Sequence, residues 1–128
     1  MFAELKQNKD QVIVTFNGVP KNNVDTEKYM MQLDRVFAQK KKFRIIYDTR
    51  NIGNIGLSHI LAQAKYMNKR KDQTKKYMQC CAVLGSDQTK VLLKILFKFK
   101  KPSVKHFYVS TNMDKIKAFM KNPQSFQK

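Results

Sequence analysis

The sequence predicts an α/β domain with a mostly parallel sheet of about five strands and helices on its faces. Strand-like and helix-like segments alternate along the 128 residues in the order β-β-α-β-α-β-α-β-α, and such alternation requires crossover connections between parallel strands. Only the short turn Asn8-Lys9-Asp10 separates the first two strands, so these should form an N-terminal antiparallel hairpin. A chain of this length is enough for one domain with its own core and too short for two ordinary domains. We expect a single domain over residues 1–121 and a flexible tail at 122–128.

The elements of the first half follow from residue type and spacing. Residues 2–7 and 11–17 are the hairpin strands, the second rich in β-branched and aromatic residues. A helix is expected from about Asp25 to Lys40, with Asn23 as its N-cap. The segment FRIIYD, 43–48, is apolar enough for a central strand. Apolar residues then recur at helical spacing over 57–67, and the polar, cationic segment that follows, 68–76, is expected to be solvated.

The second half continues the alternation. The run MQCCAVL, 78–84, indicates a buried strand that stops at Gly85. Its adjacent residues Cys80 and Cys81 would point to opposite faces, which excludes a shared metal site and argues against a structural disulfide, in keeping with a reducing compartment. Ser86 should cap a helix that ends before Pro102. A strand over 104–109 and a closing helix over 112–121 complete the domain.

The helix expected over residues 86–102 carries the main candidate site. At about 100° per residue, its core-facing side holds apolar residues: Val91, Leu92, Ile95, Leu96 and Phe99. Leu93 and Phe97 project outside that side among lysines, which suggests a partner that is both apolar and negative. The alternative is that this pair packs against the closing helix, where Phe119 and Met120 also need cover. The predicted anionic-partner surface consists of Leu93, Phe97, Lys90, Lys94, Lys98, Lys100 and Lys101.

The formal net charge of +17 is the dominant feature of the composition, with 26 lysines and arginines against 9 acidic residues. Most of these cations are lysines, and lysine is a solvated point charge, whereas arginine is the usual reader of base edges. The balance therefore favours non-specific attraction to polyanions or anionic membranes. Alternatively, an AT-rich genome enriches Lys, Asn and Ile codons with no binding role. Two secondary basic clusters are predicted, Lys40, Lys41, Lys42 and Arg44, and Lys69, Arg70, Lys71, Lys75 and Lys76.

Several segments together resemble a known family. The hairpin leads into VTFNG and a helix, RIIYD follows, and a glycine-containing turn opens the next helix. The stretch from AVLGSDQTK to the closing DKIKAFM is the stronger part. These features resemble the SpoIIAA-like members of the STAS (anti-sigma-factor antagonist) group over about residues 2–121, which implies a STAS-like fold. In partner-switching members a phosphorylated serine directly precedes a Gly-Leu pair, but here Ile55 precedes Gly56-Leu57 and Ser58 follows it, so we do not predict that switch.

The sequence gives no positive argument for catalysis. It lacks HExxH, GxGxxG and GxxxxGKS, and its two histidines, His59 and His106, form no recognisable triad spacing. Asp48 ends a central strand, where open α/β sheets place ligand sites. The alternative is that Asp48 binds loop amides and that Ser86 and Asp87 open a helix. The residues that could gather with Asp48 are Asn54, Ser58, His59, Ser86 and Asp87.

We therefore expect no enzyme and no cofactor or metal, but a non-catalytic interaction module that docks through its lysine-rich surface to an acidic protein or an anionic membrane surface. The first alternative is non-specific nucleic-acid binding, for example by a virion structural protein of a large DNA virus; for that function only Tyr66, Tyr77 and Phe97 could stack on bases. The second is an uncharacterised enzyme. No apolar run approaches 18 residues and Met1 leads into no hydrophobic signal region. A cytoplasmic location is expected, or virion association under the viral alternative.

Overall fold

The computed structural model describes residues 3–18, 23–52, 57–99 and 102–125. A five-stranded sheet in the order β1-β2-β3-β4-β5 forms its centre. β1 (Ala3–Asn8) and β2 (Gln11–Phe16) are antiparallel, whereas β3 (Phe43–Asp48), β4 (Met78–Leu84) and β5 (His106–Ser110) each run parallel to the preceding strand. The predicted α/β architecture, with its N-terminal hairpin and mostly parallel sheet, is confirmed.

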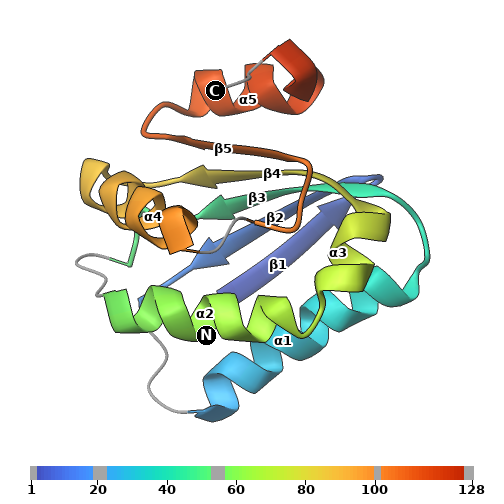
Figure 1. Ribbon diagram of the computed structural model, residues 1–128. Coiled ribbons are helices and arrows are strands. Elements are labelled where there is room, and N and C mark those ends of the chain that lie inside the picture. Colours follow the sequence, from blue (N-terminus) through green and yellow to red (C-terminus); the bar gives the residue numbers. More distant parts are fainter. Residues whose placement is uncertain (1–2, 19–22, 53–56, 100–101, 126–128) are drawn as a thin grey trace.

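The helices lie on both faces of the sheet, but unequally (Figure 1). They are α1 (Asn23–Ala38), α2 (Leu57–Asn68), α3 (Lys71–Tyr77), α4 (Asp87–Phe99) and α5 (Met113–Lys121), with a short 3-10 turn, η1 (Pro123–Ser125), in the expected tail. Because the parallel strands follow one another in chain order, right-handed crossovers place every connecting helix on the same face. Only α5, which follows the last strand, covers the other face.

The two faces have separate cores. The larger core packs β-strand residues against α1, where Leu33 and Phe37 are fully buried. The smaller core packs β3 and β4 against Ile116, Phe119 and Met120 of α5. Cys80 lies in the smaller core and Cys81 in the larger one. The two thiols therefore point to opposite faces as predicted, and both are free.

The segment after α2 that was expected to be solvated is mostly exposed, and part of it forms a separate helix, α3. Helix α3 is mostly polar, and its one buried residue, Thr74, is 4% exposed. The Thr74 hydroxyl donates a hydrogen bond to the carbonyl oxygen of Arg70 at 2.9 Å. A single buried residue leaves no apolar period in the sequence, so periodicity does not reveal this helix.

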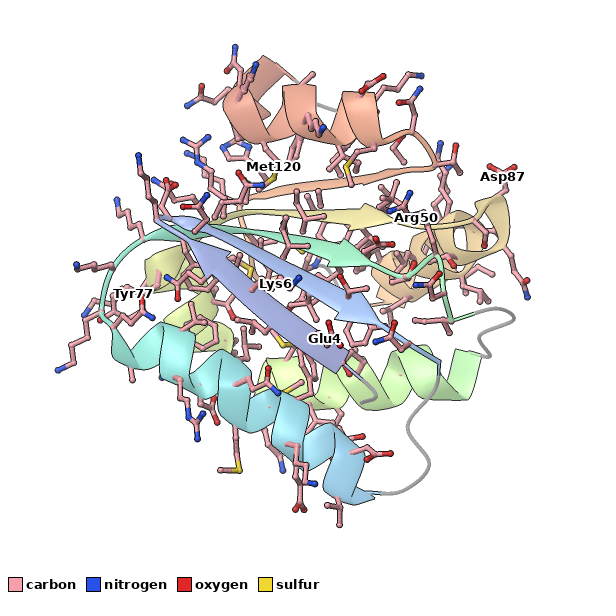
Figure 2. The ribbon with its side chains drawn as sticks, turned by 180° about the vertical axis from the view of Figure 1, so that it is seen from behind. Glu4, Lys6, Arg50, Tyr77, Asp87 and Met120 are labelled. Atoms are coloured by element: carbon pink, nitrogen blue, oxygen red, sulfur yellow. The ribbon has the colours of Figure 1, made fainter. Side chains whose placement is uncertain are left out.

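The helices α1, α2, α4 and α5 all begin at the same end of the sheet. The crossover helices run against the strands they connect, so α1, α2 and α4 begin at the carboxyl end of the parallel strands. Helix α5 also begins there and returns to the amino end, where Arg44 of β3 donates to the carbonyl oxygen of Met120. Figure 2 shows Tyr77, at the amino end, and Asp87, at the carboxyl end, on opposite sides of the molecule.

Candidate functional site

Helix α4 buries a different side from the one expected. Leu96 is 7% exposed, whereas Val91 and Ile95 are 55% and 39% exposed. The ring of Phe97 packs edge-on against Phe107 of β5, with centroids 4.8 Å apart and planes at 86°. The prediction that Val91 and Ile95 belong to the core is therefore wrong. Phe97 is partly buried and turns toward the sheet, and the contact that covers it is with β5 rather than with α5.

Contacts of the first turn of α4 account for which side of the helix is buried. Thr89 is buried, and its backbone N–H donates to the Ser86 hydroxyl at 3.2 Å. Its side chain lies so close to Gly85 that a Cβ on that glycine would come within 3.2 Å of it. Positions three, four, seven and eight residues after Thr89 share its side of the helix. They are the partly or fully buried residues Leu92, Leu93, Leu96 and Phe97.

The opposite side of α4 is exposed and mixes apolar with cationic residues. We call Val91, Lys94, Ile95 and Lys98 the α4 outer face; all four are exposed. Of the remaining lysines predicted for this surface, Lys90 is partly buried. Lys100 and Lys101 lie outside the described residues.

The structure brings parts of the two secondary basic clusters together. One group precedes β3 and the other closes α3 before β4, and the first residues of these strands, Phe43 and Met78, are register partners. Their lysines are all exposed and gather at the amino end of the sheet. We call them the amino-end basic surface: Lys40, Lys41, Lys42, Lys75 and Lys76.

Helix termini account for only part of this charge. Helices α1, α3 and α5 end at the amino end of the sheet (Figure 1), and each helix C-terminus carries about −0.5 elementary charge, or about −1.5 in total. The five lysines of the amino-end basic surface carry +5. Complementing the helix dipoles therefore leaves most of this positive charge without an internal counterpart.

The arginine of the second cluster has a structural role. The Nε and Nη2 atoms of Arg70 donate to the two carboxylate oxygens of Asp34 at 2.6 and 2.9 Å. Its Nη1 donates to the carbonyl oxygen of Tyr66 at 3.0 Å. The Asp34 carboxylate raises the pKa of Arg70. The pair ties the junction of α2 and α3 to α1.

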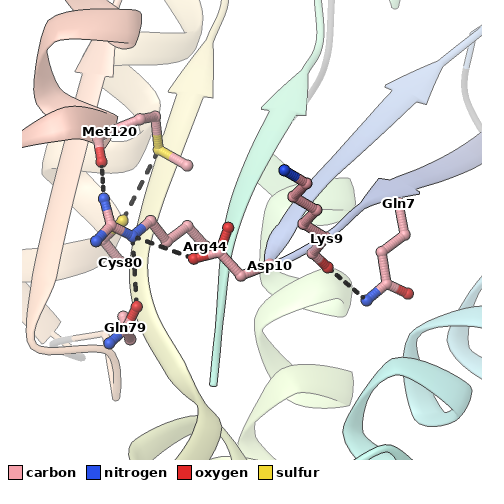
Figure 3. A network of polar contacts seen from close by, with 7 residues as sticks. All are labelled: Gln7, Lys9, Asp10, Arg44, Gln79, Cys80 and Met120. Atoms are coloured by element: carbon pink, nitrogen blue, oxygen red, sulfur yellow. Dashed lines mark hydrogen bonds and ion pairs between the residues drawn. The ribbon is translucent and has the colours of Figure 1, made fainter. Parts of the chain in front are cut away.

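The arginine of the first cluster also joins separate elements (Figure 3). Arg44 donates through Nη1 to the carbonyl oxygen of Met120 and through Nε to Oε1 of Gln79 at 3.3 Å. Its Nε also lies 3.9 Å from a carboxylate oxygen of Asp10. Arg44 thus connects β3 to β4, to α5 and to the hairpin turn.

The lysines behave differently from these arginines. Apart from Lys90, every lysine in the described part of the chain is exposed. Within those same residues, the ion pairs are made by Arg44, Arg50 and Arg70, and none by a lysine. The described lysines therefore present their charge to solvent.

Asp48, the residue considered both for a ligand site and for capping, is engaged in local interactions. Asp48 is 8% exposed, and its Oδ1 accepts from the backbone N–H and Nε of Arg50 at 3.1 and 3.0 Å, while Oδ2 accepts from Nη2 at 2.8 Å. These hydrogen bonds hold the pKa of Asp48 below its usual value. Ser86 caps α4 through the backbone N–H of Thr89. The capping interpretation of Asp48 and Ser86 is confirmed.

The remaining candidates do not join Asp48 in a described cluster. Asp87 is exposed in the first turn of α4, and His106 begins β5. Asn54 and the pair Ile55-Gly56 lie outside the described residues, as do the side chains of Ser58 and His59 in α2. In the described ranges, no group of three or more His, Cys, Asp or Glu side chains could hold a metal ion.

Neither thiol is activated. Burial raises the pKa of Cys80 to about 11, an effect that the nearby Arg44 partly offsets. Burial also raises the pKa of Cys81, which lies in the larger core. A nucleophilic cysteine requires a depressed pKa, so the described environment of both residues is structural.

Sequence reasoning missed a second exposed apolar position beside α4. Leu61 is 50% exposed on α2, and α2 contacts α4. Among the described residues, three of the five large apolar side chains that are exposed lie on these two helices: Leu61, Val91 and Ile95. For α4, the residue that identifies the buried side is Thr89, because Leu92, Leu93, Leu96 and Phe97 follow it at helical spacing.

Over the described residues, no helix has the length and apolar character needed to cross a membrane.

Comparison with known proteins identifies the fold. No protein-family model and no curated protein matches the chain. Among solved structures, the chain is similar to an uncharacterised protein of the DUF3478 family from Shewanella loihica PV-4, which has a SpoIIAA-like fold. The two align with a TM-score of 0.62 and 13% identity over 92% of this chain and 91% of that chain. The predicted resemblance to SpoIIAA-like proteins is therefore confirmed at the level of the fold.

Proposed function

We propose that this SpoIIAA-like protein is a non-catalytic interaction module that docks through a lysine-rich surface to an anionic partner, either an acidic protein or an anionic membrane surface. One observation carries the proposal: the described lysines other than Lys90 are exposed and none of the described lysines makes an ion pair, whereas three of the four arginines are engaged within the fold. Free ammonium groups attract polyanions without requiring a fixed geometry. The amino-end basic surface concentrates that charge beyond what the helix termini neutralise.

The non-catalytic part of the proposal is supported by how the candidate catalytic side chains are used. The Asp48 carboxylate is bound by Arg50, and the Ser86 hydroxyl caps a helix. Both cysteines are buried with raised pKa values. Each group performs a structural task in its described environment, which favours a binding role over a chemical one.

The test measures binding of the whole chain to three probes over a salt series. The probes are phosphatidylserine-containing vesicles, poly-glutamate and a single-stranded DNA oligonucleotide. We expect binding to at least one probe and weaker binding as salt rises, because surface charges are screened. Absence of binding to all three at low salt would refute the proposal.

Matched variants separate a defined surface from net charge alone. One variant removes four charges from the amino-end basic surface: Lys41→Gln, Lys42→Gln, Lys75→Gln and Lys76→Gln. The control removes four charges elsewhere: Lys6→Gln, Lys28→Gln, Lys115→Gln and Lys117→Gln. We expect the first variant to lose more affinity. Equal losses would show that the total charge, and not this surface, attracts the partner.

Non-specific nucleic-acid binding is the second candidate, favoured by aromatic rings beside the lysines. The ammonium group of Lys76 lies 5.4 Å from the ring centroid of Tyr77, and that of Lys69 lies 6.0 Å from the ring of Tyr66. Alternating cations and aromatics are typical of single-strand binding surfaces. Both rings also pack against the larger core, which limits the ring face free for stacking. Loss of oligonucleotide affinity in Tyr77→Leu would favour this candidate.

A further inference from the structure

The α4 outer face exposes two large apolar side chains to solvent. Val91 and Ile95 are four residues apart, so they lie one above the other on the same side. They are 55% and 39% exposed. Lys94 and Lys98 occupy the same side of the helix, with the same spacing. The result is an apolar pair directly beside a cationic pair.

The neighbouring helix extends this character. Leu61 of α2 is 50% exposed, and Lys65 follows one turn later on the same side. Helix α2 contacts α4 and contains no acidic residue. The sole carboxylate of α4 is Asp87, in its first turn. The described exposed side chains of these neighbouring helices therefore include apolar and basic residues, and the one carboxylate of the two helices lies in the first turn of α4.

Helix α1 shows that apolar exposure alone is not the signal. Its residues Val24 and Met31 are 52% and 57% exposed, close to the value for Val91. Their helix, however, carries three carboxylates as well as cations, so its exposed surface has mixed charge. A partner that is both apolar and anionic would therefore bind α4 in preference to α1.

We propose that the α4 outer face docks onto the surface of an anionic lipid bilayer, with the helix axis parallel to the membrane plane. Val91 and Ile95 enter the boundary between headgroups and acyl chains, while Lys94 and Lys98 bind lipid phosphates and carboxylates. This inference rests on the proposed function and names its partner. A bilayer offers an apolar layer and a negative surface within one side-chain length of each other. A purely acidic polymer would satisfy the lysines and leave the apolar pair in water.

The placement of the lysines supports this geometry. Lysine side chains are long and flexible, so their ammonium groups can reach the headgroups while their methylenes lie along the acyl boundary. Lys98 is exposed in the last turn of α4. The exposed lysines elsewhere on the protein add longer-range attraction to a negative membrane.

The test uses the full chain and sedimentation with vesicles of phosphatidylcholine alone or with 30% phosphatidylserine. Burial of the exposed parts of Val91 and Ile95 contributes about 5-fold each to partitioning, so Val91→Ser with Ile95→Ser should weaken binding about 25-fold. Each lysine near the surface contributes about 5-fold, so Lys94→Gln with Lys98→Gln should have an effect of similar size. Circular dichroism verifies that each variant is folded.

Two controls match these variants in chemistry but not in position. Val24→Ser with Met31→Ser removes two apolar side chains from α1 that are at least as exposed as Ile95. Lys115→Gln with Lys117→Gln removes two charges from α5, on the other face of the sheet. Both controls should change binding by less than about 3-fold, since neither touches the docking helix.

A spectroscopic measurement locates the contact directly. The chain contains no tryptophan, so Val91→Trp and Met31→Trp each introduce a single reporter. With phosphatidylserine vesicles, the emission at position 91 should shift to the blue and be quenched by brominated lipids. The emission at position 31 should stay unchanged.

The outcomes separate this inference from the proposed function. An equal loss in the α4 and α1 variants, or no blue shift at position 91, would overturn membrane docking by α4. Salt-sensitive binding to poly-glutamate without vesicle binding would also overturn it, while the proposed function would stand. Absence of binding to vesicles, poly-glutamate and DNA alike would refute both.

Discussion

Replacing Arg70 by Gln should destabilise the protein and should weaken its attraction to polyanions no more than the loss of an exposed lysine does. The side chain of Arg70 is only 17% exposed and makes two hydrogen bonds to Asp34 and one to the carbonyl oxygen of Tyr66. Although Arg70 lies in a basic run of the sequence, its charge is already paired. Its neighbour Lys71 is exposed and serves as the matched control for the loss of one positive charge.

The magnitude follows from the contacts. Bidentate Arg–carboxylate pairs are stronger than neutral hydrogen bonds, and hydrogen bonds to charged groups contribute about 1.5–3 kcal/mol. The Asp34 side chain is 47% exposed, so water partly replaces the lost donor, and an exposed pair contributes only about 0–1 kcal/mol. We expect Arg70→Gln to lower the free energy of unfolding by about 2 kcal/mol, and Lys71→Gln to change it by less than about 0.5 kcal/mol.

A double-mutant cycle provides the assay. Urea unfolding gives the free energies of unfolding of Arg70→Gln, Asp34→Asn and the double variant. The pairwise coupling should be about 1 kcal/mol or more, as for residues in one hydrogen-bond network. In parallel, Lys71→Gln should weaken poly-glutamate binding at least as much as Arg70→Gln does. A coupling near zero, or a larger binding loss from Arg70→Gln, would refute the division between structural arginines and free lysines.

Three further predictions concern residues away from the lysines. Gly85→Ala should destabilise by about 2 kcal/mol in urea unfolding, because its Cβ would lie 2.6 Å from the hydrogen-bonded Oγ1 of Thr49; a variant as stable as the wild type would contradict this packing. Cys80 and Cys81 should react with a thiol reagent at pH 8 far more slowly than in the urea-unfolded chain, since burial raises both pKa values; equal rates would contradict their burial. The lowered pKa of Asp48 contributes stability that is present above about pH 4 and is lost as the pH falls through the folded-state pKa. Asp48→Asn should therefore lose less stability between pH 6 and pH 3 than the wild type, and equal losses would count against the pairing.

Much of the fold could be predicted because its strands are strongly marked in the sequence. Residues 43–48 and 78–84 are apolar runs bounded by charged residues or glycine, and the structure has β3 and β4 with these bounds. The cap at Ser86 was also recognisable, since a short polar side chain before a helix satisfies a free backbone N–H group. These signals are local, so they do not depend on the rest of the chain.

The orientation of α4 could not be predicted from periodicity because apolar residues surround most of the helix. Val91, Leu92, Leu93, Ile95, Leu96 and Phe97 point in almost every direction, so several buried arcs are equally consistent with the sequence. Tertiary contacts choose between them: Thr89 packs beside Gly85, and Phe97 packs on Phe107. The exposed apolar residues of α4 are therefore Val91 and Ile95, and not the predicted pair Leu93 and Phe97.

The basic surface could not be predicted in full for a similar reason. Residues 40–42 and 75–76 are far apart in sequence and meet only because β3 and β4 are adjacent and parallel. Arg44 and Arg70 resemble surface cations in the sequence, yet each binds groups from distant segments. The charge runs therefore contain exposed lysines together with two arginines, Arg44 and Arg70, that bind groups within the fold.

The spatial order of the strands has a consequence for how the chain reaches its folded state. Because the sheet is arranged β1-β2-β3-β4-β5, every strand after the first joins the edge left by its predecessor. No strand has to insert between two that are already paired. Such a sheet can grow during synthesis as each segment leaves the ribosome, beginning with the local hairpin and adding one crossover unit at a time. The smaller core, which needs α5, can close only when the last helix has emerged.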